Sequence, residues 1–163
     1  MHDRKLEERE EKTGHTHGRG WWSPIDDETD PNVIFDVNKK TVAIDFDGVI
    51  HKYLTPIGAD EQRQVHDPPV YQAKEFVEQC LENNFNVVFF TARHVSEGGL
   101  DAVRDWLAEW GFPKLPVTGR KPIAVLYIDD RGFQFTGANW PTMEYLTNFQ
   151  PWNRKQTGNW ARE

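Results

Sequence analysis

Three short apolar runs, separated by two amphipathic segments, constrain the fold of this 163-residue chain more than any other feature. Residues 41–46, 85–91 and 124–128 are rich in β-branched and aromatic side chains, as buried strands are. Residues 70–81 and 100–110 carry apolar side chains at three- and four-residue spacing, which predicts helices. Strands that alternate with helices form right-handed crossovers into a parallel sheet. We therefore expect an α/β fold in three layers, a central parallel sheet with helices on both faces.

Weaker patterns flank these elements. Residues 33–37 fit an edge strand, and residues 141–149 fit a closing helix. We place one domain at 31–149, between a flexible N-terminal arm at 1–30 and a C-terminal tail at 150–163. The first part of the arm offers almost no apolar side chain to bury, so ordering it would cost entropy with little return.

Tryptophans stand near both ends of the chain. Trp21 and Trp22 lie in the arm, and Trp152 and Trp160 lie in the tail. Adjacent indoles are costly to leave in water, so we expect the arm pair to dock on the domain or on a partner chain. A homo-oligomer held through the Trp-rich termini is one expectation that follows.

Composition narrows the classes of partner. The formal net charge of -7 disfavours an extended nucleic-acid surface, although a local basic pocket is compatible with it. The chain has one cysteine, Cys80, and lacks an apolar run of about 18 residues. We expect a cytoplasmic protein that does not enter a membrane and that acts on a small substrate.

Polar side chains end each predicted strand. Ligands of such sheets bind beyond the carboxyl ends of the strands. Asp45 and Asp47 end the first strand, Thr91 ends the second, and the pair Asp129 and Asp130 ends the third. Residues two apart on an extended segment send their side chains to the same side, so Asp45 and Asp47 should meet.

Four carboxylates in one place repel one another unless a cation or protons neutralise them. Oxygen ligands without His or Cys favour Mg²⁺, so the predicted metal ligands are Asp45, Asp47, Asp129 and Asp130. A single Asp-x-Asp is usually a solvated turn or a cap, but the acidic pairs occur here together with other candidate ligands of phosphate. Those phosphate ligands are Gly48, Thr91, Ala92 and Lys121.

The segment between Gly48 and the helix at 70–81 is long enough to form a flap over the site. We expect one or two of its polar residues to contact substrate, with His51 a candidate, although a solvated loop explains such residues equally well. Arg93 and Arg131 lie beside the proposed pocket and are further candidates. For Arg131 a salt bridge to a carboxylate is as good an interpretation.

Four segments carry a resemblance to a known family: IDFDGVI, FFTAR, GRKP and YIDDRG, in this order along the chain. Together they resemble the motifs of the haloacid dehalogenase-like (HAD) superfamily, across roughly residues 41–147. The resemblance implies a Rossmann-like fold without a large cap domain and a Mg²⁺-dependent phosphatase. It implies Asp45 as the nucleophile and Asp47 as the general acid and base. It also implies that Thr91 and Lys121 hold the phosphate.

The resulting prediction is a phosphomonoesterase that works through an aspartyl-phosphate on a small phosphorylated metabolite or nucleotide. One alternative is a 3′-phosphatase of nucleic-acid ends, because IDDR also resembles the phosphatase half of phage polynucleotide kinase-phosphatases. A second alternative, of another class, is a catalytically silent HAD-like binding module. Intact Asp45, Asp47 and Lys121 argue against the silent module.

Overall fold

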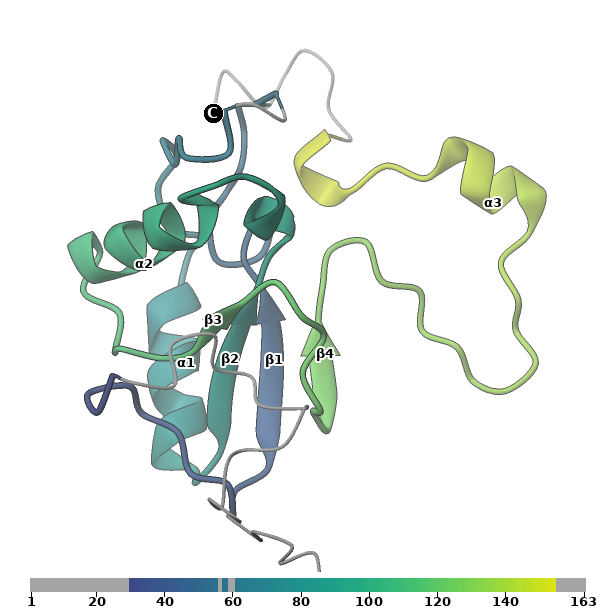
Figure 1. Ribbon diagram of the computed structural model, residues 1–163. Coiled ribbons are helices and arrows are strands. Elements are labelled where there is room, and N and C mark those ends of the chain that lie inside the picture. The colour runs from purple at the N-terminus through teal and green to yellow at the C-terminus, as the bar shows by residue number, and fades with distance from the viewer. Residues whose placement is uncertain (1–29, 56, 59–60, 155–163) are drawn as a thin grey trace, which may run out of the picture.

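The computed structural model describes residues 30–55, 57–58 and 61–154. Its centre is a parallel sheet whose strands lie in the order β3-β2-β1-β4 (Figure 1). The strands are β1 (Thr41–Asp45), β2 (Asn86–Phe90), β3 (Val117–Thr118) and β4 (Leu126–Ile128). The α/β class and the parallel sheet are confirmed, and β3 is a strand that the sequence pattern did not predict.

The register of the sheet brings three strand ends together. Asp45 pairs with Phe90 of β2, and Ile44 pairs with Ile128 of β4. The residues that follow these strands therefore share one edge of the sheet. The chain reaches β2 from β1, and returns from β3 to the other side of β1, so β1 and β4 flank the point where the strand order reverses.

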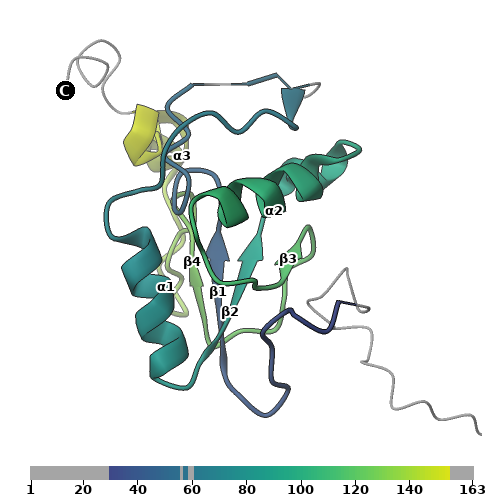
Figure 2. The same cartoon turned by 90° about the vertical axis from the view of Figure 1, so that its left-hand side faces the viewer.

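Helices α1 (Ala73–Glu82) and α2 (Gly99–Glu109) lie on one face of the sheet, in front of the strands in Figure 2. Their buried side chains pack on alternate residues of the strands, which form one core cluster. The strand residues in this cluster are Val42, Ile44, Val87, Phe89 and Val117. The predicted starts of both helices were close, with α1 beginning three residues later because Pro68 and Pro69 are followed by a turn.

The opposite face has no helix within the described part of the chain, which corrects the expected three layers to two. The connection at residues 119–125 runs from β3 to β4 on this side instead of a helix. The Tyr127 hydroxyl donates a hydrogen bond to the Pro122 carbonyl, and the Lys121 Nζ lies 4.7 Å from the centroid of the Tyr127 ring. The connection is too short to form a crossover helix.

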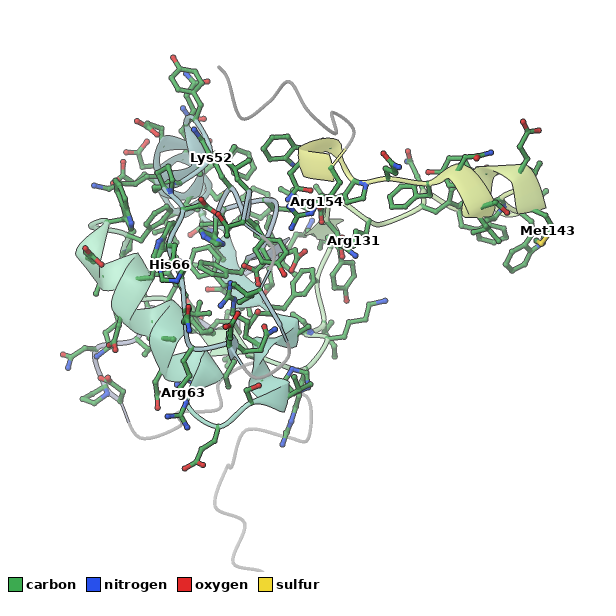
Figure 3. All side chains as sticks on the ribbon, turned by 90° about the horizontal axis from the view of Figure 1, so that it is seen from above. Lys52, Arg63, His66, Arg131, Met143 and Arg154 are labelled. Carbon is green, nitrogen blue, oxygen red and sulfur yellow. The ribbon has the colours of Figure 1, made fainter. Side chains whose placement is uncertain are left out.

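Residues 131–149 form an exposed loop that stands away from the sheet (Figure 1). It contains α3 (Met143–Asn148), which buries none of its residues. Figure 3 shows Met143 far out on this loop, and Arg131 and Arg154 near its base. The predicted helix at 141–149 therefore exists in part, but it does not close the core.

The chain returns to the body at the 3-10 turn η3 (Trp152–Arg154). The Trp152 indole Nε1 donates to the Gly48 carbonyl at 2.6 Å, and the Asn153 amide donates to the carbonyls of Lys52 and Tyr53. The described part of the predicted tail is thus packed against the segment after β1. The other end tryptophans, Trp21, Trp22 and Trp160, lie outside the described residues, as do residues 1–29 of the predicted arm at 1–30.

Residues 33–37 do not form the predicted edge strand. Ile34 N–H donates to the Lys114 carbonyl, but the Asn86 side chain takes both the N–H and the carbonyl of Asp36. A side-chain amide here replaces the backbone ladder. Within the described ranges, no helix has the length and apolar character needed to cross a membrane.

Candidate active site

Three carboxylates gather at the end of the sheet where the strand order reverses. Asp45 ends β1, while Asp129 and Asp130 follow β4 directly. One carboxylate oxygen from each lies within 4.8 Å of the others. Three oxygen donors at this separation suit a hard divalent cation.

Asp45 has an unusual pKa. Burial, followed by the nearby charges of Asp129, Asp130 and Asp47, raises the pKa of the Asp45 carboxyl to about 8. A hydrogen bond from the Phe46 N–H, at 2.9 Å, opposes the shift without cancelling it. Without a cation the carboxyl holds its proton at neutral pH, and a bound cation would favour the ionised form that a nucleophile requires.

The pKa of the Asp130 carboxyl is also raised. Burial, with a smaller contribution from Asp129, raises the pKa of Asp130 even though Arg131 opposes the shift. Its Oδ1 is buried without a hydrogen-bond partner among the described residues. A buried acceptor left without a partner costs free energy, so a ligand that satisfied it would stabilise the fold. The donor set and this unpartnered oxygen both fit Mg²⁺.

Gly48 makes room for this cluster. A Cβ placed on Gly48 would lie 2.4 Å from the Asp130 Oδ2, and the Gly48 φ of 84° is in the left-handed region. Glycine is therefore favoured at position 48 for two reasons, the lack of space for a Cβ and the left-handed backbone. The side chain that approaches Gly48 closely is Asp130, and the role of Gly48 as a phosphate ligand stays a prediction.

Asp47 is held apart from the cluster by a buried arginine. Arg93 Nε donates to Asp47 Oδ2, and Arg93 Nη2 donates to Asp47 Oδ1, both at 2.8 Å. His51 Nδ1 lies 2.9 Å from the same Oδ1. Burial alone would raise the pKa of Asp47, but hydrogen bonds from His51 and Arg93 outweigh it and hold the pKa below the usual value. Both oxygens of Asp47 are thus engaged, and the three-carboxylate group does not include it.

The backbone turns between Asp45 and Asp47. Extended backbone ends at Asp45, and the N–H groups of Val49, Ile50 and His51 all donate to the Phe46 carbonyl. The chain therefore turns at Phe46, whose ring enters the helix-side core. The expectation that the two carboxylates point to the same side assumed extended backbone through Asp47, whereas β1 ends at Asp45.

Arg93 and His51 do not line the open pocket. Each is 1 % exposed. Arg93 Nη1 donates to the carbonyls of Gln62 and Gln64, which ties the segment after β1 to Asp47. The His51 Nε2 accepts from the Asp67 N–H, so the ring proton is on Nδ1 and the Nδ1–H donates to Asp47. Both side chains position Asp47 in this structure, and neither is placed to contact substrate.

A cavity of about 940 Å³ opens beside the acid cluster. It contains Asp45 and Asp129 together with the predicted phosphate ligands Thr91, Ala92 and Lys121, and with Arg131. The Thr91 Oγ1 accepts from the Arg93 N–H, which leaves its hydroxyl proton free to be donated. Lys121 forms no ion pair in the part of the chain that the structure describes, so its charge is available to an anion.

Several residues of the cavity were not predicted from the sequence as site residues. They include aromatic and polar side chains from β2, β4 and the loop after β4: Phe90, Tyr127, Phe133 and Gln134. Trp152, whose indole bonds to Gly48, is separated from it by 104 residues, and no local pattern indicates that contact. Strand-end position would have found Phe90, which directly precedes Thr91.

Comparison of the chain with protein-family models, with curated proteins and with solved structures gives no match. The site is therefore interpreted from its own residues.

Proposed function

We propose that this chain is a Mg²⁺-dependent phosphomonoesterase of the HAD-like type, with a Rossmann-like fold and no large cap domain. The observation that carries the proposal is the placement of opposite charges in one cavity. The carboxylates of Asp45 and Asp129 line this cavity together with Lys121 and Thr91. A phosphate ester with a cation satisfies both sets of groups at once.

Asp45, Asp129 and Asp130 would hold the Mg²⁺, which supplies charge neutralisation for the transferring phosphoryl group. An oxygen of Asp45 forms a bond to phosphorus while the bond from phosphorus to the ester oxygen breaks. Lys121 and the Thr91 hydroxyl bind the phosphoryl oxygens and offset their charge. Water then attacks phosphorus, which releases phosphate and restores the Asp45 carboxylate.

Asp47 is the candidate proton carrier. Its bonds with Arg93 and His51 stabilise the ionised carboxylate, which is the form that accepts a proton from the attacking water. The same bonds oppose protonation, so donation to the leaving oxygen requires that Asp47 first gain a proton against them. The structure thus supports the base half of the role more directly than the acid half.

The proposal is tested by phosphate release from sugar phosphates, nucleoside monophosphates and 3′-phosphorylated oligonucleotides, with Mg²⁺ or with EDTA. Turnover should require Mg²⁺ and should be lost in Asp45→Asn. Asp105→Asn on the exposed side of α2 is the matched control and should keep wild-type rates. Absence of turnover by folded wild-type protein on the whole panel would contradict the proposal and favour the silent binding module.

One observation favours the alternative of nucleic-acid ends. Arg120, Lys121 and Arg131 all line the cavity of a chain whose net charge is -7. A local basic pocket of this kind is compatible with phosphates that flank a strand end. Preference for the oligonucleotides in the same panel would select this alternative.

A further inference from the structure

The cavity beside the acid cluster has a second chemical character that phosphate binding does not explain. Four side chains from the end of the 119–125 connection, from β4 and from the loop after β4 give it an apolar wall. These are Val125, Leu126, Tyr127 and Phe133. All four remain exposed to solvent, Leu126 at 56 % and Phe133 at 40 %.

An exposed apolar surface next to charged groups is characteristic of a binding site whose ligand has an apolar part. A sugar phosphate would meet Lys121 and Thr91 but would leave the apolar wall in water. We propose that the apolar wall binds the base of a nucleoside phosphate, whose phosphate lies at Asp45 and Lys121. This inference rests on the proposed function for the phosphate end of the ligand.

The aromatic members of the wall favour a flat, aromatic group. The Phe90 and Tyr127 rings meet edge to face, with centroids 6.3 Å apart, while the ring of Phe133 meets Tyr145 in the same manner. Such a contact engages the rim of one ring and a single face of the other, so each ring keeps at least one face outside the contact. Lys121 lies over the Tyr127 ring, so one cation joins the wall to the phosphate end of the cavity.

Polar groups in the same cavity favour a base over an acyl chain. His94, Arg131 and Gln134 line the cavity beside the wall. Their nitrogen and oxygen atoms match the donors and acceptors on the edge of a base. An acyl chain would cover the polar ends of Arg131 and Gln134 without offering them a hydrogen-bond partner, which costs free energy. A volume of about 940 Å³ is within the range of cavities that hold ligands larger than a phosphate ion.

The test compares two substrates that differ only in the base, uridine 5′-monophosphate and ribose 5-phosphate, at equal Mg²⁺. The wild-type kcat/KM should favour the nucleotide. Loss of a base-stacking ring weakens binding by about 5- to 150-fold, so Phe133→Ala should reduce the preference by that factor. Phe133→Trp should retain it. Phe76→Ala is the matched control, because Phe76 is 42 % exposed on α1 and does not line the cavity.

The outcomes separate this inference from the proposed function. Hydrolysis of both compounds without preference for the nucleotide, or a preference that Phe133→Ala leaves intact, would overturn the inference while the phosphatase stands. If neither compound is hydrolysed, calorimetric titration of the wild-type protein with the same two compounds decides. Tighter binding of the nucleotide that weakens in Phe133→Ala would support the inference, and equal or absent binding would overturn it.

The source of the nucleoside phosphate is read from a second arm of the experiment. Uridine 5′- and 3′-monophosphates are compared with oligouridylates that carry a 5′- or 3′-phosphate. Higher kcat/KM for the mononucleotides would identify a free nucleotide, and higher kcat/KM for an oligouridylate would identify a strand end. Either result supports binding of the base by the apolar wall.

Discussion

Replacing Asp45 by Asn should stabilise the protein when no metal is present. The pKa of Asp45 is about 8 in the folded chain against 3.8 in the unfolded reference. The folded state therefore holds a proton that the unfolded state releases as the pH rises. The free energy of unfolding is therefore highest, as far as Asp45 is concerned, below pH 3.8, and it falls as the pH rises toward 8.

The magnitude follows from the pKa difference. Each pH unit between the two values costs the wild-type protein about 1.4 kcal/mol of unfolding free energy, so the cost at pH 7 has an upper limit of about 4 kcal/mol. Asn does not titrate, so Asp45→Asn removes the cost. The advantage of the variant should grow by about 2.7 kcal/mol between pH 5 and pH 7.

Urea denaturation in EDTA at pH 5, 6 and 7 measures this directly. The midpoint of Asp45→Asn should exceed that of the wild type by an amount that increases with pH, while Asp105→Asn shows no such trend. Saturating Mg²⁺ should narrow or reverse the difference, because the cation stabilises the wild-type cluster selectively. A variant whose advantage is absent, or independent of pH, would refute the burial and charge repulsion assigned to Asp45.

Two further changes test the parts that surround the cluster. Gly48→Ala should lower the free energy of unfolding, measured in urea without metal, by about 1–3 kcal/mol, because it adds strain at positive φ and a clash with Asp130. Gly58→Ala, with open space around Gly58, should change this free energy little. Equal effects of the two substitutions would contradict the close approach of Asp130 to Gly48. Arg93→Met should lower stability by about 3–5 kcal/mol, because it removes both hydrogen bonds of the Arg93 guanidinium from the largely buried Asp47 carboxylate and leaves it only the bond to His51. Arg93→Lys should lower the free energy of unfolding less, and Arg63→Lys at an exposed position should lower it by under about 0.5 kcal/mol. An Arg93→Met protein as stable as the wild type would show that the ion pair of Arg93 with Asp47 does not stabilise the fold.

The strand and helix pattern predicted most of the sheet because its elements are long enough to show periodicity. Residues 41–46 and 85–91 contain β1 and β2 to within one residue at each end. The strand at Val117–Thr118 has two residues, too few for any pattern, and it forms because the chain packs beside β2 there. The absence of a helix on the second face follows from the 119–125 connection, which is too short to form a crossover helix.

Some residues of the candidate site were also predicted from the sequence, and others were not. The strand-end rule predicted Asp45, Thr91, Asp129 and Asp130 together because parallel strands end at one edge. The contact of Arg93 with Asp47 was not predicted, since it depends on a turn at Phe46 that removes Asp47 from the strand. The apolar wall was also missed, because Phe133 and Tyr127 read as core or loop residues until their exposure is known.

The acid cluster is difficult to explain as part of the structural framework. Burial and neighbouring carboxylates raise the pKa of both Asp45 and Asp130. The Asp130 Oδ1 also lacks a hydrogen-bond partner among the described atoms. The neighbouring Asp47 shows that the same strand end can bury a carboxylate with its bonds satisfied, through Arg93 and His51. Asp45 and Asp130 therefore lower the stability of the fold at the position where a bound cation and phosphate would offset their charge and burial. A site that is complete only when its ligand is bound is the arrangement expected of a binding or catalytic centre.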